Sequence, residues 1–327
     1  MIIVTGGAGF IGSNLIKILN SKGFEDIMVV DDLTDGSKMH NLASLKIYDY
    51  VDLDDFINRI NCGESYLKST CVFHLGACSS TSEWDGKYLM KNNFEYSKNL
   101  LNWCQTYDKQ FIYASSASVY GLGKSGFREE LECETPINMY AYSKFLFDQH
   151  VRHEMNTFKA QVVGLRYFNV YGPFEAHKDN MVSPVFQFNK QIIEQGQAKL
   201  FEVDKDHAEK YRRDFIHVED CANVNYWFLK NKNSSGIFNV GTGTARSFDD
   251  VAAIVCDWHQ KFGVKDAEVT SSAFPENLRG AYQPYTQSDL SKLRGAGYSQ
   301  EFISLEVGIN NYLDTLNVGV GAKTGQF

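Results

Sequence analysis

Short, wholly apolar runs alternate with longer segments of helical periodicity through the first half of the chain. Apolar runs without polar alternation are typical of strands buried on both faces, and apolar residues every three or four positions are typical of helices. Strands joined by helical crossovers form a parallel sheet that binds ligands beyond the carboxyl ends of its strands. We therefore predict an α/β fold with a doubly wound parallel sheet of the Rossmann type. The predicted strands are residues 1–5, 27–30, 71–75, 110–115 and 161–166, and the predicted helices between them include 52–60, 84–107 and 139–155.

The alternation of strands and helices becomes irregular in the second half of the chain. We predict a dinucleotide-binding domain over residues 1–170 and a smaller, mainly substrate-binding lobe over 171–318. Another apolar run indicates that the chain returns to the sheet near 213–245, so the boundary between the two is discontinuous. Residues 319–327 have three glycines and little apolar content, and we expect a loose tail. Helices are expected at 182–195, 248–262 and 305–316.

The first predicted strand runs directly into a glycine turn, formed by Gly6, Gly9 and Gly12, which opens a helix. Bare backbone lets phosphate oxygens approach, and the free N–H groups of a helix N-terminus point at them. The second predicted strand ends in Asp31, about 20 residues past the turn, where an acid can hold a ribose hydroxyl. This combination predicts a dinucleotide site, and the alternative is a glycine loop that only turns the chain.

Composition excludes several classes of protein. With 40 acidic and 32 basic residues the net charge is -8, which disfavours a nucleic-acid partner. No apolar run reaches the roughly 18 residues that a membrane span needs, so we expect no membrane partner. The seven cysteines are scattered and form no CxxC pair, which suits a reducing compartment and indicates no metal site. Because the first strand begins at residue 2, we expect no export signal and a cytoplasmic location.

Tyr140 and Lys144 stand four residues apart on a predicted helix, so both side chains leave the same helix face. A phenol with an ordinary pKa of about 10 acts as a base at neutral pH only if its anion is stabilised, which an ammonium group one turn away can do. The alternative is chance spacing on a solvated helix. The pair follows a strand that ends near Ser116, whose hydroxyl can orient a substrate alcohol beside the phenol. A nucleotide site, a positioned base and a hydroxyl donor are the parts that hydride transfer needs.

Several motifs resemble the extended short-chain dehydrogenase/reductase family over nearly the whole chain. They are residues 5–12, Ser116, residues 140–144 and residues 166–173. Within that family, residues 76–81, 83–88 and 142–148 resemble the ADP-L-glycero-D-manno-heptose 6-epimerases. The resemblance implies a nucleotide-sugar epimerase of lipopolysaccharide core biosynthesis that uses a tightly held NADP. It also implies a homo-oligomer, commonly a pentamer.

The resemblance also assigns functional residues. Cofactor contacts fall, besides the glycine turn, on Phe10, Ile11, Asp31, Asp32, Lys38, Gly76, Ala77, Cys78, Ser79, Asn92, Lys144, Val170 and Lys178. The nucleotide-sugar site falls on Asn169, Phe201, Glu202, Arg213 and Tyr282, and further substrate positions of the family are occupied here by Asn180, Gln187, Val203 and Asp204.

Two of these assignments leave alternatives open. Leu53 replaces a cofactor-site lysine of the family, and the cofactor faces Asp31 and Asp32, so NAD is possible in place of NADP. A guanidinium grips a diphosphate with two parallel bonds, and Arg212 is an adjacent rival to Arg213 for that contact.

The resemblance implies a redox mechanism with two acid/base residues. Lys178 would otherwise pass as an exposed loop residue, and the family pattern places the second acid/base there. Tyr140 or Lys178 removes the hydroxyl proton while the C6 hydride goes to the nicotinamide, Ser116 hydrogen-bonds the reacting oxygen, and the other base then donates the proton.

Two rival functions are weighed against this one. One is another nucleotide-sugar 4-epimerase or dehydratase, although a dehydratase needs an acidic partner after Ser116 and this chain has Ala117 and Ser118 there. The other is a redox-sensing regulator that binds NADP without catalysis, which could dispense with Tyr140 and Lys144.

Overall fold

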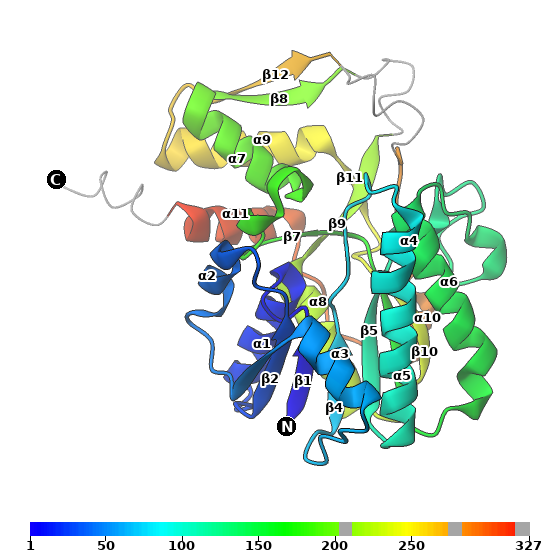
Figure 1. The fold of residues 1–327 in the computed structure, drawn as a ribbon. Coiled ribbons are helices and arrows are strands. Elements are labelled where there is room, and N and C mark those ends of the chain that lie inside the picture. Colours follow the sequence, from blue (N-terminus) through cyan, green and yellow to red (C-terminus); the bar gives the residue numbers. More distant parts are fainter. Residues whose placement is uncertain (203–210, 274–282, 318–327) are drawn as a thin grey trace.

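The computed structural model describes residues 1–202, 211–273 and 283–317, and its centre is a seven-stranded sheet (Figure 1). Its strands are β1 (Ile2–Thr5), β2 (Ile27–Asp31), β3 (Asp49–Asp52), β4 (Cys71–His74), β5 (Gln110–Ser116), β6 (Val162–Tyr167) and β10 (Gly236–Val240). They lie in the order β10-β6-β5-β4-β1-β2-β3, and every pairing is parallel. The predicted doubly wound α/β class is confirmed.

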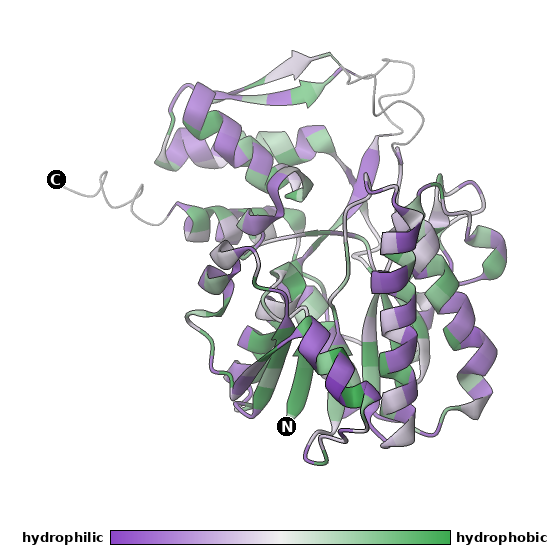
Figure 2. Ribbon diagram, in the orientation of Figure 1, coloured by the Kyte–Doolittle hydropathy of each residue, from purple (hydrophilic) through white to green (hydrophobic). Residues whose placement is uncertain are grey.

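Helices cover both faces of this sheet (Figure 1). On one face α1 (Phe10–Ser21) and α8 (Val218–Lys230) pack into one core, and on the other α3 (Leu53–Asn61), α5 (Tyr96–Thr106) and α6 (Met139–Glu154) pack into a second. Because both faces are covered, the central strands are mainly apolar, and Figure 2 shows them largely in green.

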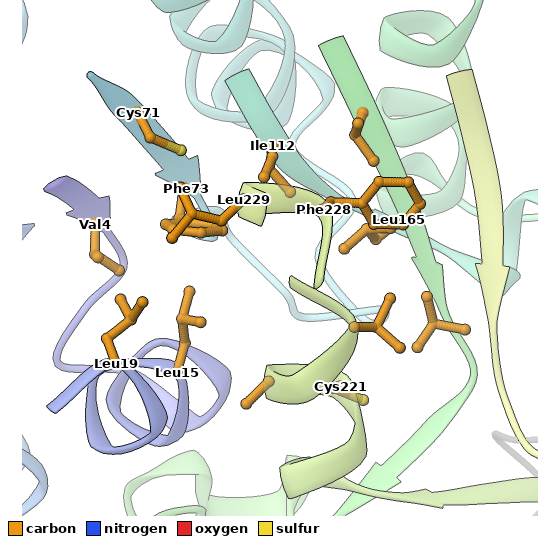
Figure 3. Close-up of a cluster of buried hydrophobic side chains, with 14 of the residues drawn as sticks. Val4, Leu15, Leu19, Cys71, Phe73, Ile112, Leu165, Cys221, Phe228 and Leu229 are labelled. Carbon is orange, nitrogen blue, oxygen red and sulfur yellow. The ribbon is translucent and has the colours of Figure 1, made fainter. Parts of the chain in front are cut away.

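The first core is drawn in Figure 3, where Leu15 of α1 lies below Phe73 of β4 and Phe228 of α8 lies against Leu165 of β6. All four are fully buried. Burial of one such side chain stabilises the fold by about 1.5–3 kcal/mol, so this contact holds α1 and its glycine turn firmly on the sheet.

The strand order reverses between β1 and β4, where ligands bind in folds of this type. Gly6 follows β1 and Gly76 follows β4, and a Cβ atom on Gly6 would lie 2.5 Å from the Gly76 nitrogen. The two turns therefore touch at the switch point, and only glycine at position 6 permits this.

A second layer of elements lies beyond the carboxyl ends of the strands (Figure 1). It has its own apolar core, in which three helices contribute buried side chains. The predicted helices at 248–262 and 305–316 are confirmed with those bounds. Its elements are α7 (Pro184–Gln195), α9 (Phe248–Phe262), α11 (Leu305–Leu316), a parallel pair β8 (Gln197–Phe201) and β12 (Glu268–Ser272), and a three-stranded sheet of β7 (Asn169–Tyr171), β9 (Arg212–His217) and β11 (Ala245–Ser247).

The remaining elements are short. The helix predicted at 84–107 is a continuous run of three segments, α4 (Gly86–Leu89), a π-helical turn (Met90–Glu95) and α5.

Among the helices that the structure describes, none is long and apolar enough to cross a membrane. The division into two domains stays a prediction, and the tail expected at 319–327 lies outside the described residues. The other elements are α2 (Met39–Leu42), α10 (Ser291–Gly295) and the 3-10 turns Gly36–Lys38, Ala117–Tyr120, Leu131–Cys133, Met155–Thr157 and Ala176–Met181.

Candidate functional site

The glycine turn after β1 forms an open cradle at the start of α1. Gly6 has a φ of +68° and its N–H donates to the Val30 carbonyl at 2.8 Å. Gly9 is the residue that precedes α1, no side chain caps the helix, and its first turn has no acidic residue. The first N–H groups of α1 and its positive dipole end therefore face the turn, which suits the pyrophosphate of a dinucleotide.

A substitution at Gly12 tests whether this cradle holds a dinucleotide. A Cβ atom there would lie 2.1 Å from the Gly6 carbonyl oxygen, so alanine forces the turn outward. Such overpacking costs about 1–3 kcal/mol, and we expect Gly12→Ala to weaken dinucleotide binding roughly 10- to 100-fold. Gly295→Ala is the control, because a Cβ at that helical position meets nothing within 4 Å. Titration of nucleotide-stripped protein measures both, and equal affinity in the two variants would contradict the proposed cradle.

Asp31, at the end of β2, ties the cradle to the loop that follows it. Its carboxylate accepts hydrogen bonds from Ala8 N at 2.8 Å, Asp32 N at 2.8 Å and Lys38 Nζ at 2.7 Å. Lys38 also donates to the Asp32 carbonyl at 2.7 Å, and a hydrogen bond from Thr34 lowers the pKa of Asp32. Asp31 thus positions the glycine turn, and Lys38 offsets its charge.

The loop after β4, which contains Cys78, is held by an asparagine that the sequence analysis missed. Cys78 N donates to Asn93 Oδ1 at 2.9 Å, and Asn93 Nδ2 donates to the Cys78 carbonyl at 3.0 Å and to Ser143 Oγ at 3.0 Å. Asn93 is buried in the π-helical turn, and such turns are frequent at functional sites. The predicted residue, Asn92, is half-buried and donates within its own helix. Asn93 connects the loop after β4 to α6.

A buried histidine, to which the sequence analysis gave no role, supports the same loop. Thr5 Oγ1 lies 2.7 Å from His74 Nδ1, and His74 Nε2 lies 2.8 Å from Ser97 Oγ. Burial, and then the charge of Lys144, lowers the pKa of His74 to about 3, so its ring is neutral. Gly76 N donates to Thr5 Oγ1 at 3.3 Å, which fixes the second turn beside the first.

Tyr140, Ser116 and Lys144 meet at the carboxyl end of β5. Burial raises the pKa of Tyr140, and a hydrogen bond with the Ser116 side chain opposes this. Lys144 is buried and donates through Nζ to the Ala114 carbonyl at 2.9 Å. Burial lowers the pKa of Lys144 to about 8, against the opposing charge of Asp148. In the structure the Lys144 amine has a carbonyl partner and the Tyr140 hydroxyl has the serine, and the stabilisation of a Tyr140 anion by Lys144 stays a prediction.

A buried ion pair fixes α6, and with it Tyr140, against the sheet. Asp148 accepts from Tyr113 OH at 2.8 Å, from Ser115 Oγ at 2.8 Å and from Arg166 Nε at 2.9 Å. The side chains of Asp148 and Arg166 are fully buried. Removing one partner of such a pair costs about 3–5 kcal/mol, so the pair strongly favours this register of α6 on β5.

Lys178 lies in the 3-10 turn Ala176–Met181, against the start of α1. Its Nζ is 5.3 Å from the centre of the Phe10 ring. Burial lowers the pKa of Lys178, and the charge of Glu175 opposes this. The neighbouring His177 lies with Nδ1 3.2 Å from Asn41 Nδ2. A residue that reads as part of an exposed loop is therefore half-buried beside the cradle.

Arg213 and Arg212 lie on opposite faces of β9. Arg213 is 6% exposed, and Arg212 is exposed. Neighbouring β7 carries Asn169, whose Oδ1 accepts from Thr286 Oγ1 at 3.1 Å. The geometry thus separates the two rival arginines and places Arg213 on the buried side of the small sheet.

The other predicted substrate residues are exposed or lie outside the residues that the structure describes. Phe201 and Glu202 are exposed at the end of β8, and Gln187 is exposed on α7. Two predicted cofactor residues, Val170 of β7 and Ile11 of α1, are partly buried against the first core. Val203, Asp204 and Tyr282 lie outside the described residues, as does the side chain of Asn180.

Comparisons with known proteins extend over most of the chain. A family model described as the NAD dependent epimerase/dehydratase family matches residues 2–241. A protein of Alkalilimnicola ehrlichii named ADP-L-glycero-D-manno-heptose-6-epimerase is 53% identical over 317 residues, 97% of each chain. The crystal structure of the Helicobacter pylori protein of the same name has a TM-score of 0.81 at 29% identity and covers 96% of this chain and 95% of its own. Thermus thermophilus UDP-glucose 4-epimerase, in complex with NAD, has a TM-score of 0.78 at 27% identity, covering 97% and 99%.

Proposed function

The chain belongs to the NAD dependent epimerase/dehydratase family, as its motifs predicted, and we propose that it inverts C6 of ADP-heptose. It interconverts ADP-D-glycero-β-D-manno-heptose and ADP-L-glycero-β-D-manno-heptose, for lipopolysaccharide core biosynthesis. The observation that carries this proposal is the 53% identity to an ADP-L-glycero-D-manno-heptose-6-epimerase over 97% of both chains. The UDP-glucose 4-epimerase shares the fold at 27% identity, which is about half as much.

The described residues fit a nicotinamide dinucleotide. The cradle at Gly6 and Gly12 would hold its pyrophosphate on the N-terminus of α1. When bound, the cofactor accepts the hydride from C6 and returns it. We favour NADP because the Lys38 amine beside Asp31 can attract the 2′-phosphate of NADP. NAD would be favoured if the negative charges of Asp31 and Asp32, and the lack of a cation at Leu53, outweigh that attraction. The remaining proposed contacts are Gly9, Phe10, Ile11, Asp32, Gly76 to Ser79, Asn92, Lys144, Val170 and Lys178.

Two residues of this chain exchange protons with the sugar. If the hydrogen on C6 always faces the nicotinamide, the C6 hydroxyls of the two epimers point in opposite directions, so one base cannot reach both. We propose that Tyr140 serves one epimer and Lys178 the other. The Ser116 hydroxyl, which already bonds Tyr140, donates to the reacting oxygen, and Lys144 supports the site from its bond to the Ala114 carbonyl.

The nucleotide part of the substrate is held by the small sheet and the lobe around it. Arg213 grips the diphosphate from β9, and Asn169 lies on the neighbouring strand. The other proposed contacts are Gln187, Phe201, Glu202, Asn180, Val203, Asp204 and Tyr282.

One experiment tests the function directly. The purified protein, without added cofactor, is incubated with ADP-heptose and with UDP-glucose, and the epimers are separated. We expect conversion of ADP-heptose alone, because an epimerase that returns the same hydride must keep its cofactor. Heating the protein should release the nucleotide and identify it as NADP or NAD. Conversion of UDP-glucose alone would favour the 4-epimerase instead, and a dependence on added coenzyme would favour an ordinary dehydrogenase.

Replacing Arg213 by alanine should raise KM for ADP-heptose with a smaller fall in kcat, because a contact remote from C6 binds substrate and transition state alike. Loss of a charge-assisted contact should cost roughly 10- to 100-fold. Arg212→Ala is the matched control, since that side chain is exposed on the opposite face of β9. A raised KM in the control alone would move the diphosphate contact to Arg212.

We also propose a cytoplasmic, homo-oligomeric protein, on the family resemblance a pentamer. All seven cysteines are free thiols, which suits a reducing compartment. Sedimentation equilibrium of the purified protein measures the number of subunits, and a monomer would contradict the proposed assembly.

A further inference from the structure

We propose that Glu175 is the positioning residue of Lys178, holding the 172–183 loop in place and keeping the lysine amine charged. This inference deepens the proposed function, because it concerns the second proton carrier. Glu175 is fully buried three residues before Lys178. A buried carboxylate is costly unless it is hydrogen-bonded or paired, so its partners show what it does.

The partners of Glu175 attach the loop to α7. Ser183 Oγ donates to Glu175 Oε1 at 2.7 Å, and Ser183 N donates to Oε2 at 2.5 Å. The same Ser183 hydroxyl caps α7, where it accepts from Phe186 N at 3.3 Å. One carboxylate thus ties the loop to the first turn of a helix in the second layer.

Other contacts tie the same loop to the dinucleotide side. Asn14 Nδ2 of α1 donates to the Pro173 carbonyl at 2.8 Å, and Asn41 Nδ2 of α2 donates to the Phe174 carbonyl at 3.3 Å. The Lys178 side chain rests on Phe10. The loop therefore bridges the two layers, and Glu175 is its buried attachment on the side of the second layer.

The backbone of the loop is strained on both sides of Lys178. Phe174 has a φ of +73° and Asp179 a φ of +49°, a region that residues other than glycine seldom adopt. Such conformations persist only where the surrounding contacts over-determine them, and they are frequent at functional sites. Glu175 directly follows the first strained residue, and its bonds to Ser183 close the loop beyond the second.

Charge couples Glu175 to Lys178 as well. Burial lowers the pKa of Lys178, and Glu175 is the charge that raises it. Burial raises the pKa of Glu175, while the hydrogen bonds from Ser183 and then the charge of Lys178 lower it and favour its anion. Tyr312 of α11 faces the same carboxylate, and burial and then the charge of Glu175 raise the pKa of Tyr312. The adjacent His177 has a pKa lowered by burial and by Lys38 and Lys178, with Asp35 and Asp31 opposing. The charges of Lys38, Asp35 and Asp31 act on His177, whereas Glu175 acts on Lys178. The pKa of Lys178 therefore depends on the charge of Glu175.

The test measures how readily the Lys178 amine reacts with trace acetic anhydride at different pH values, followed by mass spectrometry of the peptide that contains it. Only the uncharged amine reacts, so the midpoint reports its pKa without any catalysis. In Glu175→Gln the loop loses its anion, and we expect the midpoint to fall by about one pH unit. Glu129→Gln is the matched control, because burial also raises the pKa of Glu129, whose partner is Asn239 N at 2.7 Å. The control should leave the midpoint unchanged.

Epimerisation is measured on the same variants across pH. We expect Glu175→Gln to lower kcat about 10- to 100-fold with KM little changed, while cofactor content stays that of the parent. Glu175→Asp keeps the charge but withdraws it by one methylene, so its midpoint should fall less, and it covers the case in which the glutamine variant does not fold. A midpoint equal to the parent in whichever variant folds overturns the inference. A lowered midpoint with unchanged epimerisation upholds Glu175 as the positioning residue and instead contradicts the proposed role of Lys178.

Discussion

Replacing Tyr140 by phenylalanine is expected to lower the rate of ADP-heptose epimerisation about 10²- to 10⁴-fold, the range that a positioned acid/base contributes. The substitution removes one oxygen atom from a side chain that bonds Ser116 and lies on a helix fixed by Asp148. Because the Tyr140 phenol supports neither the glycine-turn cradle nor the small sheet, the content of bound cofactor and the KM for ADP-heptose should change little. The measurement is the initial rate of conversion in both directions.

Tyr142→Phe is the control for this loss. It removes the same oxygen from the same helix, but Tyr142 is 42% exposed and packs its ring near Phe145. We expect the control to epimerise at the parent rate. Loss of activity in both variants would mean that the effect belongs to the helix rather than to the Tyr140 phenol.

Replacing Lys178 by methionine is expected to lower the rate of epimerisation by about 10²- to 10⁴-fold as well, although methionine keeps the aliphatic stem that rests on Phe10. The more telling result concerns an aldehyde analogue that has no stereocentre at C6. One molecule of its hydrate is oxidised to the acid while another aldehyde is reduced to the alcohol, so cofactor and electrons balance and a single base suffices. At least one of Tyr140→Phe and Lys178→Met should retain this dismutation while epimerisation is lost.

Lys190→Met is the matched control, since this exposed lysine on α7 pairs with Glu194 across one helical turn. Its epimerisation should equal that of the parent. Parent activity in Lys178→Met would show that two side-chain bases are not needed, and His177 of the same loop or a water would then have to carry the second proton.

Much of the sheet could be predicted because its signal is local. Strands β1, β2 and β4 are buried along their whole length, and their apolar runs mark them as strands without reference to the rest of the chain. Helices α9 and α11 were predicted with the observed bounds because their apolar residues recur with helical spacing. Such patterns show that one face of a helix or strand is covered, and they do not depend on which other element covers it.

Elements stabilised by distant polar partners could not be predicted in this way. Strand β3 buries only Val51 and reads as polar. Strand β9 begins with two arginines and an aspartate, which read as a charged loop. Asp214 is nonetheless fully buried, because Thr242 N and Ser288 N donate to its carboxylate at 2.7 and 2.9 Å. Those donors lie far along the chain, so the local pattern contains no sign of them.

The residues of the candidate site fall into the same two groups, those with a local signal in the sequence and those without one. The glycine turn and the spacing of Tyr140 and Lys144 are legible in the sequence, whereas Lys178 was reached only through the family resemblance. Its half-buried place on Phe10 arises from a loop closed by Glu175 and Ser183. Asn93 has no local signal, because its role depends on hydrogen bonds with Cys78 and Ser143, which lie 15 and 50 residues away along the chain, and the cofactor contact of Asn92 stays a prediction.

The central claim, direct oxidation and re-reduction at C6, is tested most directly with ADP-heptose that carries deuterium at C6. The protein as purified is incubated with this substrate in ordinary water, and the epimeric product is examined by mass spectrometry and NMR. Because the hydrogen leaves C6 as a hydride and returns from the same site, the product epimer should keep its deuterium at C6. A product that carries ordinary hydrogen there would show that the bond is broken by deprotonation and exchange with solvent, and it would contradict the proposed mechanism.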